Sequence, residues 1–384
     1  MSATEAARTD AAAAPSSDDL VARIRELQPL IEKNAAQGEA DRRVVEESII
    51  ALTDAGIFKV AQPLRYGGYQ ASVRTMLDVS AAVAEADGGT AWVVALCNVC
   101  AWLTGLFSEQ AQDDVWGTAP EAKVSGVLTP SAEAVKVDGG YRFSGRWSFA
   151  SGSNNADYIC IHGVIEGEQA TRFGVLPAGS VQIEDVWHVS GLKGTASNDI
   201  VVSDLFVPDE WTGNFAELPK IARHPLDQRQ LGARFGSEFA AVAIGIAQAA
   251  LDDITDIARN KIPATSRSKL AADPVAQYVT GQLATDLYMA RTLLHQVGRD
   301  DQASAASGPP DNTATAIRRA RLSRAASVAA SVVEGAYGLS GTTGLFESCP
   351  LQRRLRDVRA VTQHYMLSAR SAFGPVGTAI LSED

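Results

Sequence analysis

Apolar residues recur at helical spacing in the first third of the chain. Leu20, Ile24, Leu27 and Ile31 lie three or four positions apart, which places them on one face of a helix. Similar runs follow, separated by glycine-containing breaks after which a new helix can begin. We therefore predict several packed helices between residues 20 and 116.

Helical spacing returns at about residue 230 and continues almost to the C-terminus. The breaks between these later helices are short, as in connections between antiparallel neighbours. Long helices joined in this way pack as a bundle. The four long helices that we predict lie at residues 235–259, 274–297, 312–337 and 351–373.

Between residues 124 and 208 apolar and polar positions alternate, and turn residues such as Gly139 and Gly140 separate the runs. This pattern predicts seven or eight strands. The predicted strands form one block along the chain. This order of elements excludes Rossmann and barrel folds, in which strands alternate with helices. We predict a mostly helical α+β chain. Its parts are a disordered tail (1–17), an N-terminal helical domain (18–120), a central β domain (121–215) and a C-terminal four-helix bundle domain (216–384).

Composition and charge narrow the function classes. The chain has 384 residues, of which 46% are hydrophobic and 21% charged, as in ordinary globular proteins. It carries 34 Lys and Arg against 45 Asp and Glu, a net charge of −11, which argues against nucleic acid and anionic membranes as partners. The most apolar stretch, residues 91–107, is too short to span a bilayer, so we expect a buried helix.

The N-terminus lacks the pattern of a secretory signal, and four cysteines are too few for a disulfide framework. We therefore expect a cytoplasmic protein. Cys97 and Cys100 form a CxxC pair inside the apolar stretch with no second pair, so we predict no metal site there. His162, His188, His224 and His295 have no partners at metal-ligand spacing and are interpreted as structural or surface residues.

A predicted hairpin at residues 145–152 reads GRWSFASG, and residues 128–131, which read LTPS, are predicted to lie on the strand before it. Such a β segment can present backbone amides, hydroxyls and an aromatic ring to a flat heteroaromatic ligand. From the residues alone the opposite interpretation is stronger, because Trp and Phe on a strand are usually core residues.

The order of domains, the GRWSFASG hairpin, the segment WHVSGLKGTASNDIVVSDLFVP (187–208) and the segment PLQRRLRDVRAVTQH (350–364) together resemble the acyl-CoA dehydrogenase fold. More closely they resemble its flavin-dependent monooxygenase branch. That two-component group includes oxygenases of 4-hydroxyphenylacetate, secosteroid phenols and dibenzothiophene, and some amino-sugar N-oxygenases.

The resemblance implies an oxygenase component that receives reduced FMN or FAD from a separate reductase and uses O2 as co-substrate. A flavin C4a-hydroperoxide would hydroxylate a small aromatic, phenolic or amine molecule. The chain shows no nicotinamide-binding signature, which agrees with a separate reductase. The resemblance also implies a homotetramer.

The resemblance further assigns positions. Thr129 and the hairpin would lie against the flavin, with Phe149 beside the ring and Ser151 at its N5 and C4a edge. Gly341 would reach the phosphate end of the cofactor of a neighbouring subunit. The implied cofactor-binding residues are Thr129, Trp147, Ser148, Phe149, Ser151 and Gly341, and the implied catalytic residues are His364, Ser151 and Cys100.

The residues near the C-terminus separate oxygenase from dehydrogenase. Common acyl-CoA dehydrogenases carry a catalytic Glu shortly after an Arg-Asp pair, but no acid follows Arg356-Asp357 between residues 358 and 382. His364 occupies the position of an active-site histidine of the monooxygenase branch. An imidazole titrating near neutrality suits proton transfer to or from substrate. A helix histidine packed between subunits is the competing interpretation.

Cys100 departs from the family pattern, because many relatives that hydroxylate phenols carry a histidine near this position. A thiol is a poorer base, which favours two alternatives: N-oxidation of an amine, or oxidation of an electron-rich ring that needs no deprotonation. A dehydrogenase or oxidase with a relocated base is a further alternative, but no catalytic carboxylate is visible for it, and the earlier Glu334 lies in the helix before the glycine-rich loop. The last alternative is a homologue that binds flavin but does not catalyse a reaction.

Two further features follow from the resemblance. Arg356 and Asp357 would be structural at a domain junction, while Arg353 or Arg354 would contact a phosphate. The substrate pocket would be lined by the helix at 91–107 and by the connection at 215–229.

Overall fold

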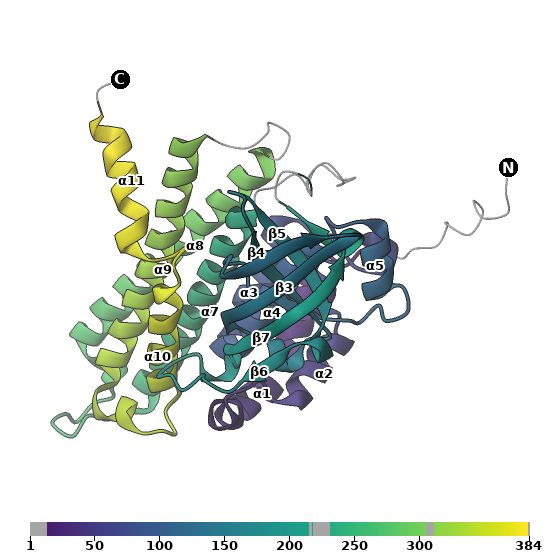
Figure 1. Ribbon diagram of the computed structural model, residues 1–384. Coiled ribbons are helices and arrows are strands. Elements are labelled where there is room, and N and C mark those ends of the chain that lie inside the picture. Colours follow the sequence, from purple (N-terminus) through teal and green to yellow (C-terminus); the bar gives the residue numbers. More distant parts are fainter. Residues whose placement is uncertain (1–13, 215–216, 218–230, 305–310, 383–384) are drawn as a thin grey trace, which may run out of the picture.

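The computed structural model describes residues 14–214, 217, 231–304 and 311–382 (Figure 1). Residues 1–13, most of the predicted tail, lie outside this part, and so does nearly all of the connection at 215–229. The first helix begins at Ser17, where the Ser16 side chain and Asp19 form a capping box. The helices before the sheet are α1 (Ser17–Asp41), α2 (Glu46–Asp54), α3 (Val73–Ala86), α4 (Gly88–Thr104) and α5 (Glu109–Trp116).

One sheet follows, and the prediction of seven or eight strands is confirmed. The strand order is β6-β7-β3-β2-β4-β5-β8, and β1 pairs in parallel with β4. The core of the sheet contains Phe143, Trp147, Ile161 and Ile200. The strands are β1 (Val124–Gly126), β2 (Ala132–Val137), β3 (Gly140–Ala150), β4 (Tyr158–Ile165), β5 (Thr171–Pro177), β6 (Gln182–Glu184), β7 (Asn198–Pro208) and β8 (Thr212–Gly213).

The C-terminal part is helical, as predicted, and its helices lie beside the sheet in Figure 1. Residue boundaries of the three domains stay predictions. The helices are α7 (Leu231–Asn260), α8 (Pro274–Ser304), α9 (Asn312–Ser340), α10 (Pro350–Gln363) and α11 (Ala369–Leu381).

The prediction of one continuous fourth helix over 351–373 is wrong. The chain leaves the helix at His364, whose carbonyl accepts the N–H groups of Leu367 and Ser368 in a tight turn. Ser323 of α9 donates a hydrogen bond to the carbonyl of Leu367 at 2.7 Å. This tertiary contact is invisible in the apolar spacing, and the turn places His364 at the end of α10.

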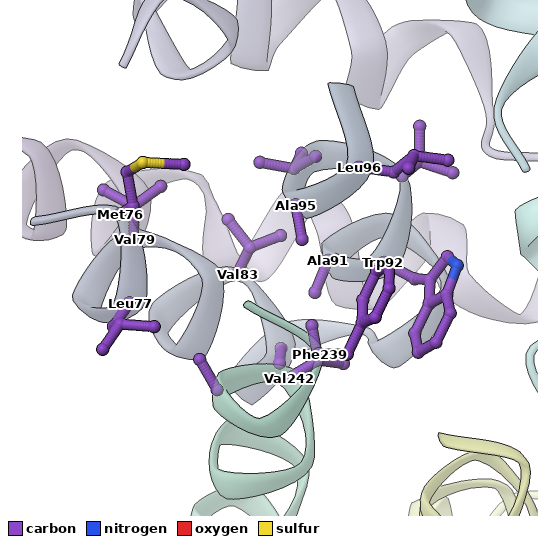
Figure 2. Close-up of a cluster of buried hydrophobic side chains, with 14 of the residues drawn as sticks. Met76, Leu77, Val79, Val83, Ala91, Trp92, Ala95, Leu96, Phe239 and Val242 are labelled. Atoms are coloured by element: carbon purple, nitrogen blue, oxygen red, sulfur yellow. The ribbon is translucent and has the colours of Figure 1, made fainter. Parts of the chain in front are cut away.

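Helix α4 is buried along all 17 of its residues, between α3, α7 and strand β1. This confirms the buried helix predicted at 91–107. Within the described residues, no helix is long and apolar enough to cross a membrane. Figure 2 shows the core that α3, α4 and α7 share, including Val83, Trp92 and Phe239.

Candidate functional site

Ser151, directly after β3, is the centre of a buried hydroxyl network. Its Oγ accepts a hydrogen bond from the indole Nε1 of Trp92 at 3.1 Å and lies 2.5 Å from Oγ of Ser197. The Ser197 hydroxyl in turn lies 2.6 Å from Oγ1 of Thr195. Ser125 donates to the carbonyl of Ser151. The position of the Ser151 hydroxyl is therefore determined by partners from three other segments.

The backbone just before Ser151 is strained. The pairing of β3 with β7 shifts between Trp147 and Ala150, and Phe149 has φ +67°. A bulky side chain in left-handed backbone is rare, and such positions concentrate at functional sites. The Phe149 ring is 69% exposed and meets the ring of Trp187 edge-on at 6.0 Å. An exposed aromatic in this conformation fits the predicted place beside a flat cofactor.

The same irregularity separates two residues that strand alternation would place on one face. Trp147 is 0% exposed and donates its indole N–H to the carbonyl of His162 at 2.8 Å. It belongs to the core of the sheet, so the prediction that Trp147 lines the cofactor needs correcting. Ser148 is exposed beside Phe149. Thr129 is also exposed, but it lies in the connection between β1 and β2 rather than on a strand.

His364 lies among aromatic side chains at the end of α10. Its ring meets Phe239 edge-on at 4.6 Å and Trp92 at 5.6 Å between centroids. Nδ1 accepts the N–H of Met366 at 3.4 Å, which leaves the proton of the neutral ring on Nε2. Burial, together with the positive charge of Arg319, lowers the pKa of His364 to about 4. The expectation of a histidine titrating near neutrality is therefore wrong, and the ring is neutral at pH 7.

Trp92 connects the two predicted catalytic residues. It donates to Ser151, stacks on Phe239 at 3.9 Å and presents its ring to His364. Figure 2 shows the stacked pair of Trp92 and Phe239. The sequence prediction missed both aromatic residues, because the apolar spacing of their helices identifies them only as core.

Cys100 does not reach this site. It is 0% exposed, and Cys160 and Gly126 lie on the side of α4 that its sulfur faces. Burial raises the pKa of this thiol well above its ordinary value. A neutral, inaccessible thiol cannot accept a proton from a substrate, so the prediction of a catalytic Cys100 needs correcting.

Gly341 lies apart from the residues above, in the turn after α9. It has φ +56° and is exposed, and Lys261 donates from Nζ to the neighbouring carbonyl of Ser340 at 2.6 Å. A Cβ at Gly341 would lie 3.5 Å from this Nζ. An open turn beside a cation can accept a phosphate, but contact with the cofactor of a neighbouring subunit stays a prediction.

The two arginines considered for phosphate binding differ. Arg354 is buried and binds Asp253 at 2.6 Å and the carbonyl of Glu85 at 3.0 Å, so it is a structural residue. Arg353 lines a cavity of about 740 Å³ with Arg42 and Lys193, and its nearest acidic partner, Asp87, is 4.0 Å away. Of the two, only Arg353 is available to an anion.

Taken together, the site offers an exposed aromatic, a positioned hydroxyl and a neutral imidazole beside an apolar wall. The acid considered as a relocated base, Glu334, pairs with Arg359 instead. His295 pairs with Asp78 at 3.2 Å, and His162 stacks on Phe173. His224 and the connection at 215–229 lie outside the described residues, apart from Glu217.

Comparisons with known proteins place the chain among oxygenases. Residues 237–369 match the family described as acyl-CoA dehydrogenase, C-terminal domain. The chain is 31% identical to the flavin-dependent monooxygenase, oxygenase subunit HsaA, of Rhodococcus jostii (strain RHA1), over 93% of this chain and 96% of that protein. It is 30% identical to the FADH2-dependent resorcinol hydroxylase, oxygenase component, of Rhizobium sp. (strain MTP-10005), over 94% of each.

The fold agrees with these sequence relationships. The structure of XiaF from Streptomyces sp. in complex with FADH2 and glycerol superposes with a TM-score of 0.89 at 25% identity, covering 96% of each chain. The predicted three-part fold is therefore confirmed.

Proposed function

The chain belongs to the flavin-dependent monooxygenases that act as oxygenase components and share the acyl-CoA dehydrogenase fold, and from this premise we propose that it hydroxylates a small aromatic or phenolic molecule with reduced flavin and O2. A separate reductase supplies the reduced flavin. One oxygen atom enters the substrate, the other leaves as water, and the two electrons come from the flavin.

The observation that carries the proposal is the link from Ser151 through Trp92 to His364. It joins the residue assigned to the cofactor with the residue assigned to the substrate. Bound flavin supplies the electrons that make O2 able to hydroxylate a substrate. The exposed ring of Phe149 would hold the flavin ring, and the Ser151 hydroxyl would lie toward its reactive edge.

His364 acts on the proton of the substrate. Because the ring is neutral and its proton lies on Nε2, Nε2–H donates a hydrogen bond to the phenol oxygen and stabilises the phenolate form. The phenolate form has the greater electron density at the ring carbon that receives oxygen. Phe239 and Trp92 keep water away from this position, which suppresses the wasteful release of hydrogen peroxide.

Aromatic hydroxylation is favoured over N-oxidation of an amine. The case for an amine came from Cys100 standing in place of a histidine, and Cys100 is fully buried beside Gly126. Nothing else among the described residues points to an amine substrate.

We include a homotetramer in the proposal. Large apolar side chains are exposed on the C-terminal helices, and patches of this kind commonly mark protein interfaces. A neighbouring subunit would cover them and could bring its Gly341 turn to the cofactor. The exposed residues are Val275, Tyr278, Tyr288 and Met289 on α8, Leu345 and Phe346 in the turn, and Phe373, Ile380 and Leu381 on α11.

The test mixes the purified protein anaerobically with reduced FMN or reduced FAD, adds oxygenated buffer in a stopped-flow instrument and follows absorbance between about 350 and 450 nm. We expect a transient whose maximum lies well below the bands of oxidised flavin. If reduced flavin reoxidises at the rate seen without protein, the proposal is wrong. Light scattering on the same sample gives the oligomeric state.

A further inference from the structure

The hydroxyl network around Ser151 has a fixed direction. At one end, the indole N–H of Trp92 can only donate, and it donates to Oγ of Ser151 at 3.1 Å. At the other end, the carbonyl of Leu192 can only accept, and it accepts the hydroxyl proton of Thr195 at 2.9 Å. Because both ends are determined by their chemistry, the direction of each bond between them follows.

The direction can be traced from Leu192 back to Ser151. Thr195 has a single hydroxyl proton, which it donates to the carbonyl of Leu192, so it must accept the proton of Ser197 across 2.6 Å. Ser197 then has no proton left for Ser151, and it accepts the proton of Ser151 across 2.5 Å. The Ser151 oxygen thus accepts one bond from Trp92 and, among the described residues, keeps one lone pair unused.

The turn that carries Thr195 is held in a costly backbone conformation. Leu192 and Ala196 lie on either side of the short turn Lys193–Thr195 and have φ +52° and +46°, in the left-handed region that non-glycine residues rarely occupy. The carbonyl of Thr195 also accepts the N–H of Gly152 at 2.8 Å. Strained segments cluster where function requires a particular placement, and here the strained turn places the acceptor end of the hydroxyl network.

We propose that Ser197 and Thr195 are positioning residues, which fix Ser151 as a hydrogen-bond acceptor toward the cofactor. The inference rests on the proposed function, in which the Ser151 hydroxyl lies toward the reactive edge of the flavin. Reduced flavin carries a proton on N5 and can donate it to the unused lone pair, whereas N5 of oxidised flavin can only accept and would meet a second lone pair. The network would therefore favour the reduced form through two residues that act only through Ser151.

A network that only stabilises the fold makes a different prediction. Breaking it would change the binding of reduced and oxidised flavin equally, because the direction of its bonds would not matter. The directional role instead predicts a change in the ratio of the two dissociation constants, transmitted across two hydroxyl groups from Thr195. Binding is therefore the readout, and it does not depend on turnover.

The test measures binding of FMN and FAD, each reduced and oxidised, to the full chain by equilibrium dialysis under anaerobic conditions. Thr195→Val keeps the shape of the side chain and removes its hydroxyl, so that Ser197 can turn its proton to Ser151 and free the Ser151 proton for N5. The ratio of dissociation constants, oxidised over reduced, should fall about fivefold from that of wild type, the effect of one neutral hydrogen bond. Ser197→Ala should lower the ratio similarly, and Thr195→Ser, which keeps the hydroxyl, should preserve it.

Ser125→Ala is the matched control, because Ser125 donates to the carbonyl of Ser151 and leaves the direction of the hydroxyl network unchanged. This variant can weaken the binding of both flavin forms, but their ratio should stay that of wild type. If Thr195→Val or Ser197→Ala folds and keeps the wild-type ratio, the inference is wrong.

A flavin analogue tests the same bond without any substitution in the protein. Oxidised 5-deaza-FMN has a C–H in place of N5, so its binding does not depend on a hydrogen bond there, and it avoids the change in ring shape on reduction. Wild type should bind it at least as tightly as oxidised FMN, and tighter binding of oxidised FMN would overturn the inference. The proposed function fails separately, through the absence of the flavin transient in the stopped-flow experiment.

Discussion

The carboxylate of Asp357 accepts a hydrogen bond from the backbone N–H of Leu192 at 2.6 Å. Asp357 lies on α10, the helix that ends at His364. The carbonyl of Leu192 accepts a hydrogen bond from Thr195 at 2.9 Å, and the Thr195 hydroxyl leads through Ser197 to Ser151. One buried carboxyl group thus joins the helix of His364 to the loop that positions Ser151.

Replacing Asp357 with Asn should alter the pH dependence of stability. Burial and the negative charge of Asp87 raise the pKa of Asp357 to about 7 from 3.8. The folded state therefore holds a proton that the unfolded state releases, and the contribution of Asp357 falls as pH rises from about 4 to about 7. The free energy of unfolding of wild type minus that of Asp357→Asn should decrease by at most about 1.4 kcal/mol per pH unit in this range.

Denaturant titrations at several pH values measure this difference. Asp54→Asn, measured in parallel, is the control for loss of an aspartate, because Asp54 is exposed at the end of α2. A flat difference for Asp357→Asn would show that Asp357 is ionised in the folded state at pH 5.

Removing the hydroxyl of Ser151 should lower both the stability of the fold and the coupling of flavin oxidation to substrate hydroxylation. Ser151→Ala leaves the indole N–H of Trp92 and the hydroxyl of Ser197 without their partner, at about 1–3 kcal/mol. It should also lower the ratio of hydroxylated product to flavin oxidised. Ser148→Ala, exposed on the same strand, should change stability by less than about 0.5 kcal/mol. Equal coupling in Ser151→Ala and wild type would remove Ser151 from the proposed chemistry.

His364→Ala should reduce product formation by about 10²–10⁴-fold, the usual contribution of a positioned proton-transfer group. His364→Gln, which keeps a donor near the position of Nε2, should lose less. His295→Gln is the control, because His295 pairs with Asp78 away from the site. Similar losses in all three variants would show that the effect is structural.

The buried His364 should also make the free energy of unfolding depend on pH. The pKa of His364 is about 4 in the folded state, against 6.5 ordinarily, so the unfolded state binds the extra proton first. The contribution of His364 to stability is present above pH 6.5 and is lost as pH falls toward 4. The stability of wild type relative to His364→Gln should decrease over this interval by at most about 1.4 kcal/mol per pH unit. Thermal melts across this range measure it.

Periodicity predicted most helices and strands because each buries an apolar face in the core of the helices or in the core of the sheet. It failed where a tertiary contact determines the backbone conformation. The turn at His364 depends on α9, through the bond from Ser323 to Leu367, and no local signal marks it. Periodicity therefore extended one helix through the site.

The site residues were predicted from a family resemblance rather than from packing or hydrogen bonding. The errors in that prediction lie where packing and hydrogen bonding determine what a side chain contacts. The resemblance placed Ser151 at the flavin edge, which stays a prediction, and alternation could not show that a register shift separates Phe149 from Trp147. Trp92 was missed because it looks like an ordinary apolar helix residue. Its importance comes from an indole N–H that donates to Ser151, a residue of a distant segment.

Substitution of Arg354 should lower the stability of the fold much more than substitution of Arg353. Arg354→Gln breaks a buried ion pair with Asp253, and the uncompensated carboxylate should cost about 3–5 kcal/mol in the free energy of unfolding. Arg353→Gln should cost less than about 1 kcal/mol, because its nearest acid is 4.0 Å away. If Arg353 contacts a phosphate, its variant should instead weaken binding of FMN relative to riboflavin. Urea titration and flavin binding distinguish the two effects.

Substitutions of Phe149 should affect stability and cofactor binding differently. At φ +67° a Cβ is strained, whereas glycine adopts this backbone freely. Phe149→Gly should therefore be more stable than Phe149→Ala by up to about 1 kcal/mol, after the entropy that glycine loses on folding. The ring is 69% exposed and contributes little to the core, so neither variant should unfold. Both should bind reduced flavin more weakly than wild type, measured by equilibrium dialysis under anaerobic conditions. If both bind flavin as tightly as wild type, the Phe149 ring does not contact the cofactor.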